Sequence, residues 1–233
     1  MVLRLIEGTR LDNRARAGLL GKLAVGLAAS SRRAGALAVA SGRWLTDTVI
    51  DFAPHVPIRD AATLRAHHDG KIGDELAAAL IDAAAHATGA VGAAGGLVSS
   101  LEFAAPPLLL TSPVQVAAET VAVVALELKL VAELHEAYGY PATGTPAMRT
   151  AAYLGAWTRR RGLERLKSGN SLPGLVSGAA RRSLRNRLMR RAGENTVTIM
   201  PFMTGAVAGA TINARETRKL GAQIARDLGG ALT

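Results

Sequence analysis

The residue with the best claim to chemistry is Glu127, a carboxylate on the apolar side of a long predicted helix. The positions that neighbour it on the helix hold Val123, Val124, Leu130 and Val131, so no partner exists within the helix itself. A buried carboxylate needs a cation or a hydrogen-bond donor, or it becomes protonated. Glu127 is therefore a weak catalytic candidate or half of a structural pair. The partners that we consider for it are Arg149, Asn213 and Arg215.

An enzyme built around Glu127 would need a second reacting group. His135 follows on the same helix, but eight helical residues separate the two by roughly 12 Å along the axis, which is too far for a hydrogen bond. The nucleophile motif GxSxG does not occur. An enzyme acting on a lipid or apolar substrate is thus an alternative hypothesis without an identified nucleophile.

Histidines gather between residues 51 and 73, in a stretch broken by prolines and glycines. His67 and His68 are adjacent, so on a helix they point about 100° apart and do not converge on one ion. The chain has no cysteine, which excludes disulfides and thiolate metal sites. We therefore expect no metal and no cofactor.

Positive charge is concentrated in one window. Residues 158–191 hold eleven basic residues and one acidic residue. The net charge of this window is therefore +10, which equals the net charge of the whole chain. Such a window suits anionic head groups or nucleic acid, and its arginines are the candidate anion-binding residues. They are Arg159, Arg160, Arg161, Arg165, Arg181, Arg182, Arg185, Arg187, Arg190 and Arg191.

The basic window favours a non-catalytic protein that docks on an anionic membrane or lipid. Trp44 follows Arg43, and Trp157 lies just before the three arginines at 159–161, as interfacial anchors often do. Either ring could instead belong to the core. Nucleic-acid binding is the less favoured alternative, because aromatic residues make up only 3% of the chain and offer few stacking platforms.

A long helix over residues 113–138 must position these groups. Ser112 and Gln115 form a capping box around Pro113, and Gly139 followed by Pro141 provides a stop. A second helix is predicted over residues 74–101, and others over 14–39 with a break near Ser30 and Ser31, from Thr145 to the arginines at 159–161, and from near Pro201 to Gly229.

Glycines recur inside two of these helices, where each costs about 1 kcal/mol relative to alanine. Their spacing as GxxxG pairs predicts close helix contact. No strand precedes them and no Lys-Ser/Thr pair follows, which disfavours a nucleotide-binding loop. The glycines expected to pack are Gly89, Gly92, Gly96, Gly205 and Gly209. The sequence thus predicts an all-α fold, a single-domain bundle of long helices packed through glycine and alanine around the helix 113–138.

No secretory signal and no membrane-spanning helix are predicted. Glu7 and Asp12 interrupt the basic start, and prolines and Glu119 interrupt the apolar run from residue 103. Either apolar stretch, 103–118 or 195–214, is expected to be buried in protein or to dip into a membrane surface.

Three stretches together carry a family resemblance: TGAVGAAGGLVSSLEFAAP at 88–106, AELHEAYGYP at 132–141 and IMPFMTGAVAGATINARETRKLGAQIARDL at 199–228. Over residues 74–228 the chain resembles the EcsC family, and residues 1–73 form an N-terminal helical and irregular segment outside it. The resemblance implies a helical protein without established catalytic residues, cytoplasmic and peripheral to the membrane, with a membrane transporter or another protein as a further candidate partner.

Overall fold

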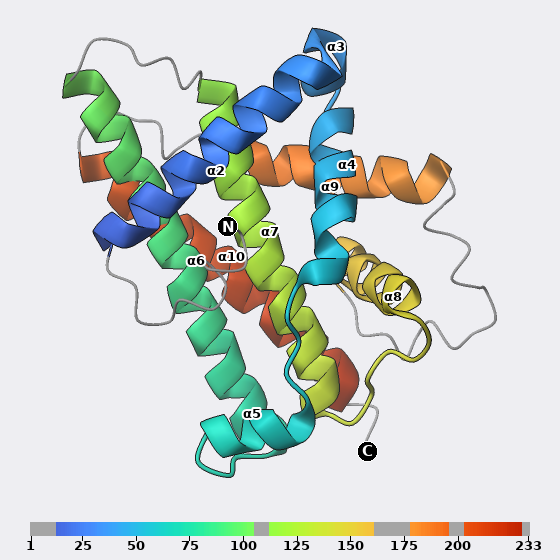
Figure 1. Cartoon of the computed structure of the whole chain (residues 1–233). Helices are drawn as coiled ribbons and strands as arrows, with labels where there is room; N and C mark the ends of the chain where they lie inside the picture. The colour runs from blue at the N-terminus through green and yellow to red at the C-terminus, as the bar shows by residue number, and fades with distance from the viewer. Residues whose placement is uncertain (1–12, 105–111, 161–177, 196–202, 230–233) are drawn as a thin grey trace.

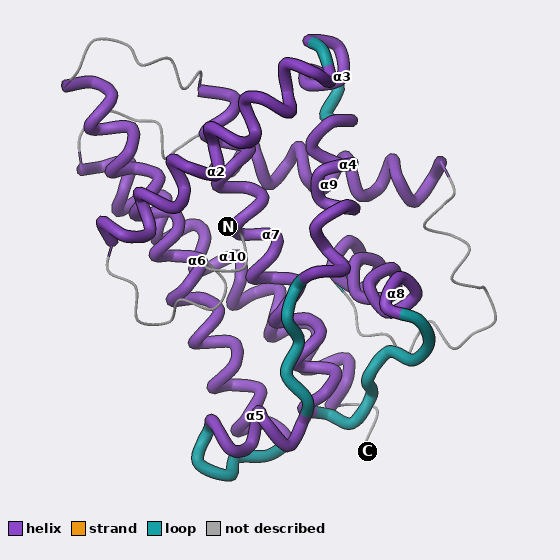
Figure 2. Tube along the Cα trace, in the orientation of Figure 1, coloured by secondary structure: helices purple, strands orange, loops and turns teal. Residues whose placement is uncertain are grey.

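The computed structural model describes residues 13–104, 112–160, 178–195 and 203–229 (Figure 1). Within these ranges every regular element is a helix, and the helices pack as one bundle, which confirms the predicted all-α class (Figure 2). The long elements are α2 (Asn13–Ala34), α6 (Gly73–Ala104), α7 (Ser112–Ala137) and α10 (Met203–Gly229). The shorter ones are α3 (Ala36–Ala40), α4 (Arg43–Phe52), η1 (Ala53–His55), α5 (Ala61–His67), α8 (Pro146–Arg159) and α9 (Gly178–Asn195).

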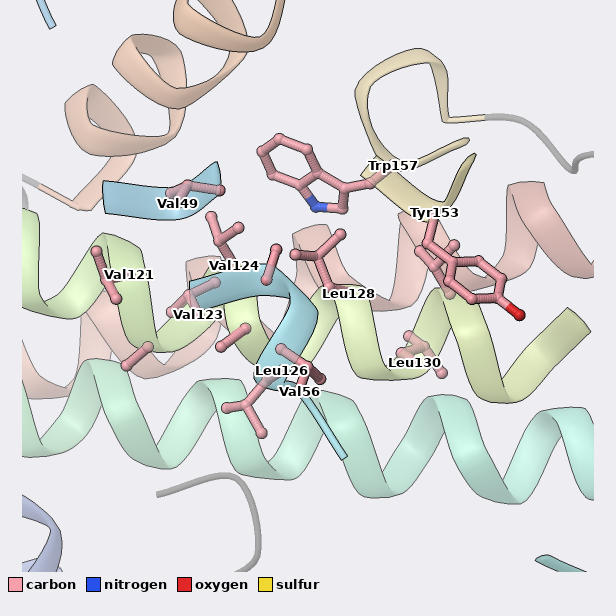
Figure 3. Packing of buried hydrophobic residues seen from close by; sticks show 14 of the residues in the cluster. Val49, Val56, Val121, Val123, Val124, Leu126, Leu128, Leu130, Tyr153 and Trp157 are labelled. Carbon is pink, nitrogen blue, oxygen red and sulfur yellow. The ribbon is translucent and has the colours of Figure 1, made fainter. Parts of the chain in front are cut away.

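The central element is α7, which contacts helices on all sides. In Figure 1, α2 crosses in front of α6 and α7, α10 lies behind them, and α4, α8 and α9 pack along the other flank. Its side chains from Val114 to Leu128 are all buried. Figure 3 shows valines and leucines of α7 meeting Val49 from α4 and Trp157 from α8. A core made of small aliphatic residues explains how so many helices approach one axis.

The helix ends follow the chemistry expected from the sequence. Gly139 adopts a left-handed φ of 76°, and Tyr140 donates its amide to the carbonyl of His135 at 2.8 Å, which closes the end of α7. The hydroxyl of Thr145 accepts from the amide of Met148 at the start of α8. Local sequence therefore suffices to set these boundaries.

Two elements of the N-terminal segment differ from expectation. The first helix breaks at Gly35, whose φ is 85°, and not at Ser30 and Ser31, because a glycine can take the left-handed turn without steric cost. The stretch 51–73, expected to be irregular, contains α5, whose first turn is capped by Asp60 accepting from the amide of Thr63 at 2.7 Å.

An ion pair holds the α5 segment against α7. Arg59 donates from Nε and Nη2 to the two carboxylate oxygens of Glu133, at 2.7 and 2.8 Å. Lys129 adds a second cation at 2.9 Å. This hydrogen bonding raises the pKa of Arg59 above its usual value. The described part of residues 1–73 is thereby packed onto the bundle.

Close packing between α6 and α10 depends on glycine. A Cβ placed on Gly92 would lie 2.5 Å from the backbone of Gly209, and one on Gly89 would lie 3.1 Å from the carbonyl oxygen of Ala210. The two helices therefore touch backbone to backbone, as the glycine spacing predicts. The surroundings of Gly96 and Gly205 lie outside the described residues.

Candidate functional site

The carboxylate of Glu127 is enclosed by three donors from three other helices. Trp157 of α8 donates its indole N–H to Oε2 at 2.8 Å, and Arg191 of α9 donates from Nη2 to Oε1 at 3.0 Å. Thr217 of α10 donates its hydroxyl to Oε1 at 3.1 Å. Glu127 itself is 1% exposed and Arg191 is 4% exposed. This arrangement joins α7, α8, α9 and α10 at one point in the core.

The network continues to α6 through threonine. The hydroxyl of Thr88 donates to that of Thr217 at 2.9 Å, and both residues are fully buried. A charge pair removed from water at this depth is stable only when its remaining polar atoms also find partners. Thr217 is a direct partner of Glu127, and Thr88 forms a second layer by donating to the Thr217 hydroxyl.

The structure corrects the partners that the sequence suggested for Glu127. Arg149 and Arg215 are exposed, and Asn213 donates to Glu119 at 3.3 Å and not to Glu127. Arg191 is the cation that pairs with Glu127, so it does not belong to the exposed basic surface to which the sequence analysis assigned it. The burial of Arg191 could not be predicted, because arginines occur on every side of this helix and the sequence does not indicate which of them faces the core.

The tryptophans are also interior residues. Trp157 is fully buried, and the guanidinium carbon of Arg187 lies 4.3 Å from its ring centroid. Trp44 is buried too and donates its indole N–H to the hydroxyl of Ser30 at 3.0 Å. The expectation that they anchor the chain at a membrane interface is therefore wrong, because both rings serve packing.

The surroundings of Glu127 are those of a structural carboxylate. Both of its oxygens accept hydrogen bonds from buried side chains of other helices. His135 lies elsewhere on α7, with its Nδ1 2.6 Å from the carbonyl oxygen of Val131 and its ring edge-on to Tyr153 at 5.5 Å. Burial lowers the pKa of His135 to about 4, so the ring is neutral at neutral pH.

A second buried carboxylate, Glu119, lies two turns away on α7. It is 1% exposed and accepts from Asn213, while Gln115 donates to the carbonyl oxygen of Gly95 at 3.0 Å. The cavity beside it lies between α2, α6 and α7 and measures about 10 Å³, which is room for one water molecule. No group of three potential metal ligands converges anywhere in the described ranges.

The predicted basic window divides into inward and outward residues. Arg187 and Arg191 face the core, Arg160 pairs with Glu216 at 3.1 Å, and Arg181 pairs with Asp47 at 2.9 Å on the surface. Arg159 is exposed at the end of α8. Arg161 and Arg165 lie outside the described residues. On α9, three arginines pair with no described carboxylate and reach solvent: Arg182, Arg185 and Arg190.

Neighbouring elements extend this outward surface. A Cβ placed on Gly42, between α3 and α4, would lie within 3.4 Å of the side chains of Met189 and Arg185, so this turn lies against α9. Arg43 follows directly and is exposed. The end of α2 adds two more exposed cations. We call the resulting surface the basic face, and it consists of Arg32, Arg33, Arg43, Arg182, Arg185 and Arg190.

One described segment, Gly73–Gly95 of α6, is long and apolar enough to cross a membrane by length and composition. Within its most apolar window 44% of the residues are buried among the other helices. The packed core helix of a bundle meets the same criterion, so the segment is weak evidence for a span.

Comparison of the chain with models of protein families, with curated proteins and with solved structures gave no match. The resemblance to the EcsC family therefore stays a prediction, and the functional argument depends on the chain's own geometry.

Proposed function

We propose that the protein is a non-catalytic, peripheral membrane protein that docks on anionic lipid surfaces through the basic face. The observation that supports this proposal is the group of cations on α2, α4 and α9 that no described carboxylate neutralises. Each Lys or Arg near an anionic surface contributes about 1 kcal/mol, so six give a useful and reversible attachment.

The separation of roles on α9 strengthens the proposal. The inward arginines are held by Glu127 and Trp157, so the helix is fixed to the core while its outward arginines are presented to a ligand. A rigid cationic surface loses little conformational entropy when it binds. The cations of the basic face come from three different helices, α2, α4 and α9.

The resemblance to the EcsC family favours the same role, in the cytoplasm beside the membrane and accessory to transport or envelope processes. A membrane transporter or another protein is a further candidate partner. The enzyme alternative receives no support from Glu127, whose oxygens are all engaged within the core.

Flotation with liposomes tests the proposal. We expect the protein to float with anionic vesicles at low salt, to be released by high salt, and to ignore neutral vesicles. Replacing Arg182, Arg185 and Arg190 together by glutamine should weaken partitioning about 100-fold, at about 1 kcal/mol per cation.

A matched control removes the same charge elsewhere. Arg65, Lys71 and Arg226 are exposed and lie outside the basic face, so their replacement by glutamine should leave most of the binding. Equal losses in both variants would reduce the effect to net charge and contradict a defined docking face. Binding to duplex DNA, but not to vesicles, would instead support the nucleic-acid alternative.

A further inference from the structure

We infer that the α3 tip, residues 34–40 with Leu37 at its centre, enters the bilayer when the basic face docks on it. This inference rests on the proposed docking and adds the segment that penetrates the membrane. It also defines the orientation of the protein on the membrane, with the α3 tip towards the bilayer.

The α3 tip is apolar, and its outer side is exposed. Leu37 is 81% exposed, more than any other large apolar side chain described. Its neighbours along the tip are alanine, glycine and valine, and α3 buries none of its residues. Ala38 and Val39 pack against the core, while residues 34–37 and 40 are exposed. An exposed leucine alone needs no explanation, but one at the end of an exposed apolar turn is a surface feature of the fold.

The α3 tip is held rigidly at both ends. On one side, the indole of Trp44 donates to Ser30 at 3.0 Å and ties the end of α2 to α4. On the other, Gly42 takes a left-handed φ of 70° and lies against Met189 of α9, where a Cβ would come within 2.5 Å of the sulfur. The apolar turn therefore projects from a fixed base.

Charge complementarity identifies the bilayer as the occupant. Between Asn13 and Thr46 the chain has no acidic residue, and Arg32, Arg33 and Arg43 flank the tip in sequence. Gly42, at the base of the tip, lies against Arg185 and Met189 of α9, so the outward arginines of α9 adjoin the base from which Leu37 projects. An apolar tip with cations around its base matches acyl chains beneath anionic head groups.

A second exposed apolar residue has the opposite surroundings. Ile72 is 65% exposed between α5 and α6, where residues 69–75 hold three acidic residues and one basic residue, Lys71. The local excess of charge is negative, so this site does not attract anionic lipid as the base of the α3 tip does. Ile72 is therefore the matched control for Leu37.

Because the chain contains no cysteine, a single fluorescent probe can be placed at either position in the full protein. We expect a polarity-sensitive probe on the Leu37→Cys variant to shift to the blue with anionic vesicles and to be quenched by brominated acyl chains. The same probe on Ile72→Cys should remain in water. Leu37→Ser should weaken vesicle binding about tenfold without changing its dependence on salt, and Ile72→Ser should not.

The outcomes separate the two proposals. If the protein binds anionic vesicles while the probe at Leu37→Cys stays unquenched, the α3 tip does not insert and docking is purely electrostatic. If both probes respond alike, penetration is not specific to the tip and the inference fails. Absence of any vesicle binding would overturn the docking proposal, and the inference with it.

Discussion

The inner and outer faces of α9 use the same residue type for opposite purposes. Arg191 is buried and bound to Glu127, whereas Arg190, its neighbour in the chain, is exposed and pairs with no described carboxylate. Arg187 likewise lies over Trp157, while Arg182 faces water. An arginine of α9 faces the core where a buried carboxylate or an aromatic ring of another helix contacts it, and faces solvent where no described residue provides such a partner. Composition alone cannot assign a basic helix to a surface.

The strongest way to break the inner face is to leave Glu127 without its cation. Replacing Arg191 by methionine should lower the free energy of unfolding by about 3–5 kcal/mol, because it strands a buried charge. Urea denaturation followed by circular dichroism measures the loss.

The double variant Arg191→Met with Glu127→Leu is the control for that experiment. Removing both charges should recover a large part of the stability, since the desolvation cost disappears with the pair. A double variant as unstable as the single one would mean that packing, and not the buried charge, accounts for the loss.

Acidification tests a second buried basic residue, His135, which is neutral in the fold, whereas Arg191 is charged and paired. His135 stays neutral in the fold because burial lowers its pKa to about 4, whereas a histidine in the unfolded chain titrates near 6.5. Below pH 6.5 the unfolded state therefore binds a proton that the folded state refuses, and stability falls as pH falls. We expect a loss of about 2 kcal/mol between pH 7 and pH 5, on top of the change due to other groups.

Urea midpoints at the two pH values isolate this contribution. His135→Phe should reduce the loss on acidification, while His86→Gln, on the exposed side of α6, should leave it unchanged. An unaltered pH dependence in His135→Phe would show that other groups carry the acid sensitivity.

Substitution of glycine by alanine should likewise have opposite effects at a buried helix contact and on an exposed helix surface. Gly92→Ala should destabilise by about 1–3 kcal/mol, because its Cβ would press on the backbone of Gly209 and separate α6 from α10. Gly18→Ala meets open space on the exposed side of α2 and should stabilise by up to about 1 kcal/mol. Thermal unfolding of the two variants measures the opposite signs; a harmless Gly92→Ala would show that the helices can move apart freely.

The smallest effect is expected on the outer face. Arg190→Gln should change the free energy of unfolding by no more than about 0.5 kcal/mol, since the side chain is solvated. Measured beside Arg191→Met, it compares two neighbouring arginines in the same urea titration. A large loss for Arg190→Gln would mean that the outer face also holds the fold together.

Helix identity was predictable because its signals are local. The start of α8 at Thr145 and the stop of α7 at Gly139 follow from residues a few positions apart. The spacing of the glycines predicted close helix contact, but not that α6 and α10 would be the two helices that meet. The break at Gly35 was missed because serines a few residues earlier looked like a better turn.

The candidate site was predictable only in part, because its contacts join distant residues. Periodicity indicated that Glu127 lies inward, but Arg191 is 64 positions away along the chain and Thr217 is 90 positions away. Which helix covers which face depends on how the whole bundle assembles. The inward turn of Arg187 and Arg191 could therefore not be read from a helix whose arginines cover every side.

The place of α10 in the bundle has a consequence for biosynthesis. It leaves the ribosome after the other described helices, yet it packs against the glycines of α6 and brings Thr217 to Glu127 and Asn213 to Glu119. Until it arrives, those two acidic side chains and the apolar surface around them lack their final cover. Contacts between residues more than a hundred positions apart form slowly. We therefore expect the apolar surfaces of α6 and α7 to stay exposed, and prone to aggregation, until α10 has been synthesised and packs against them.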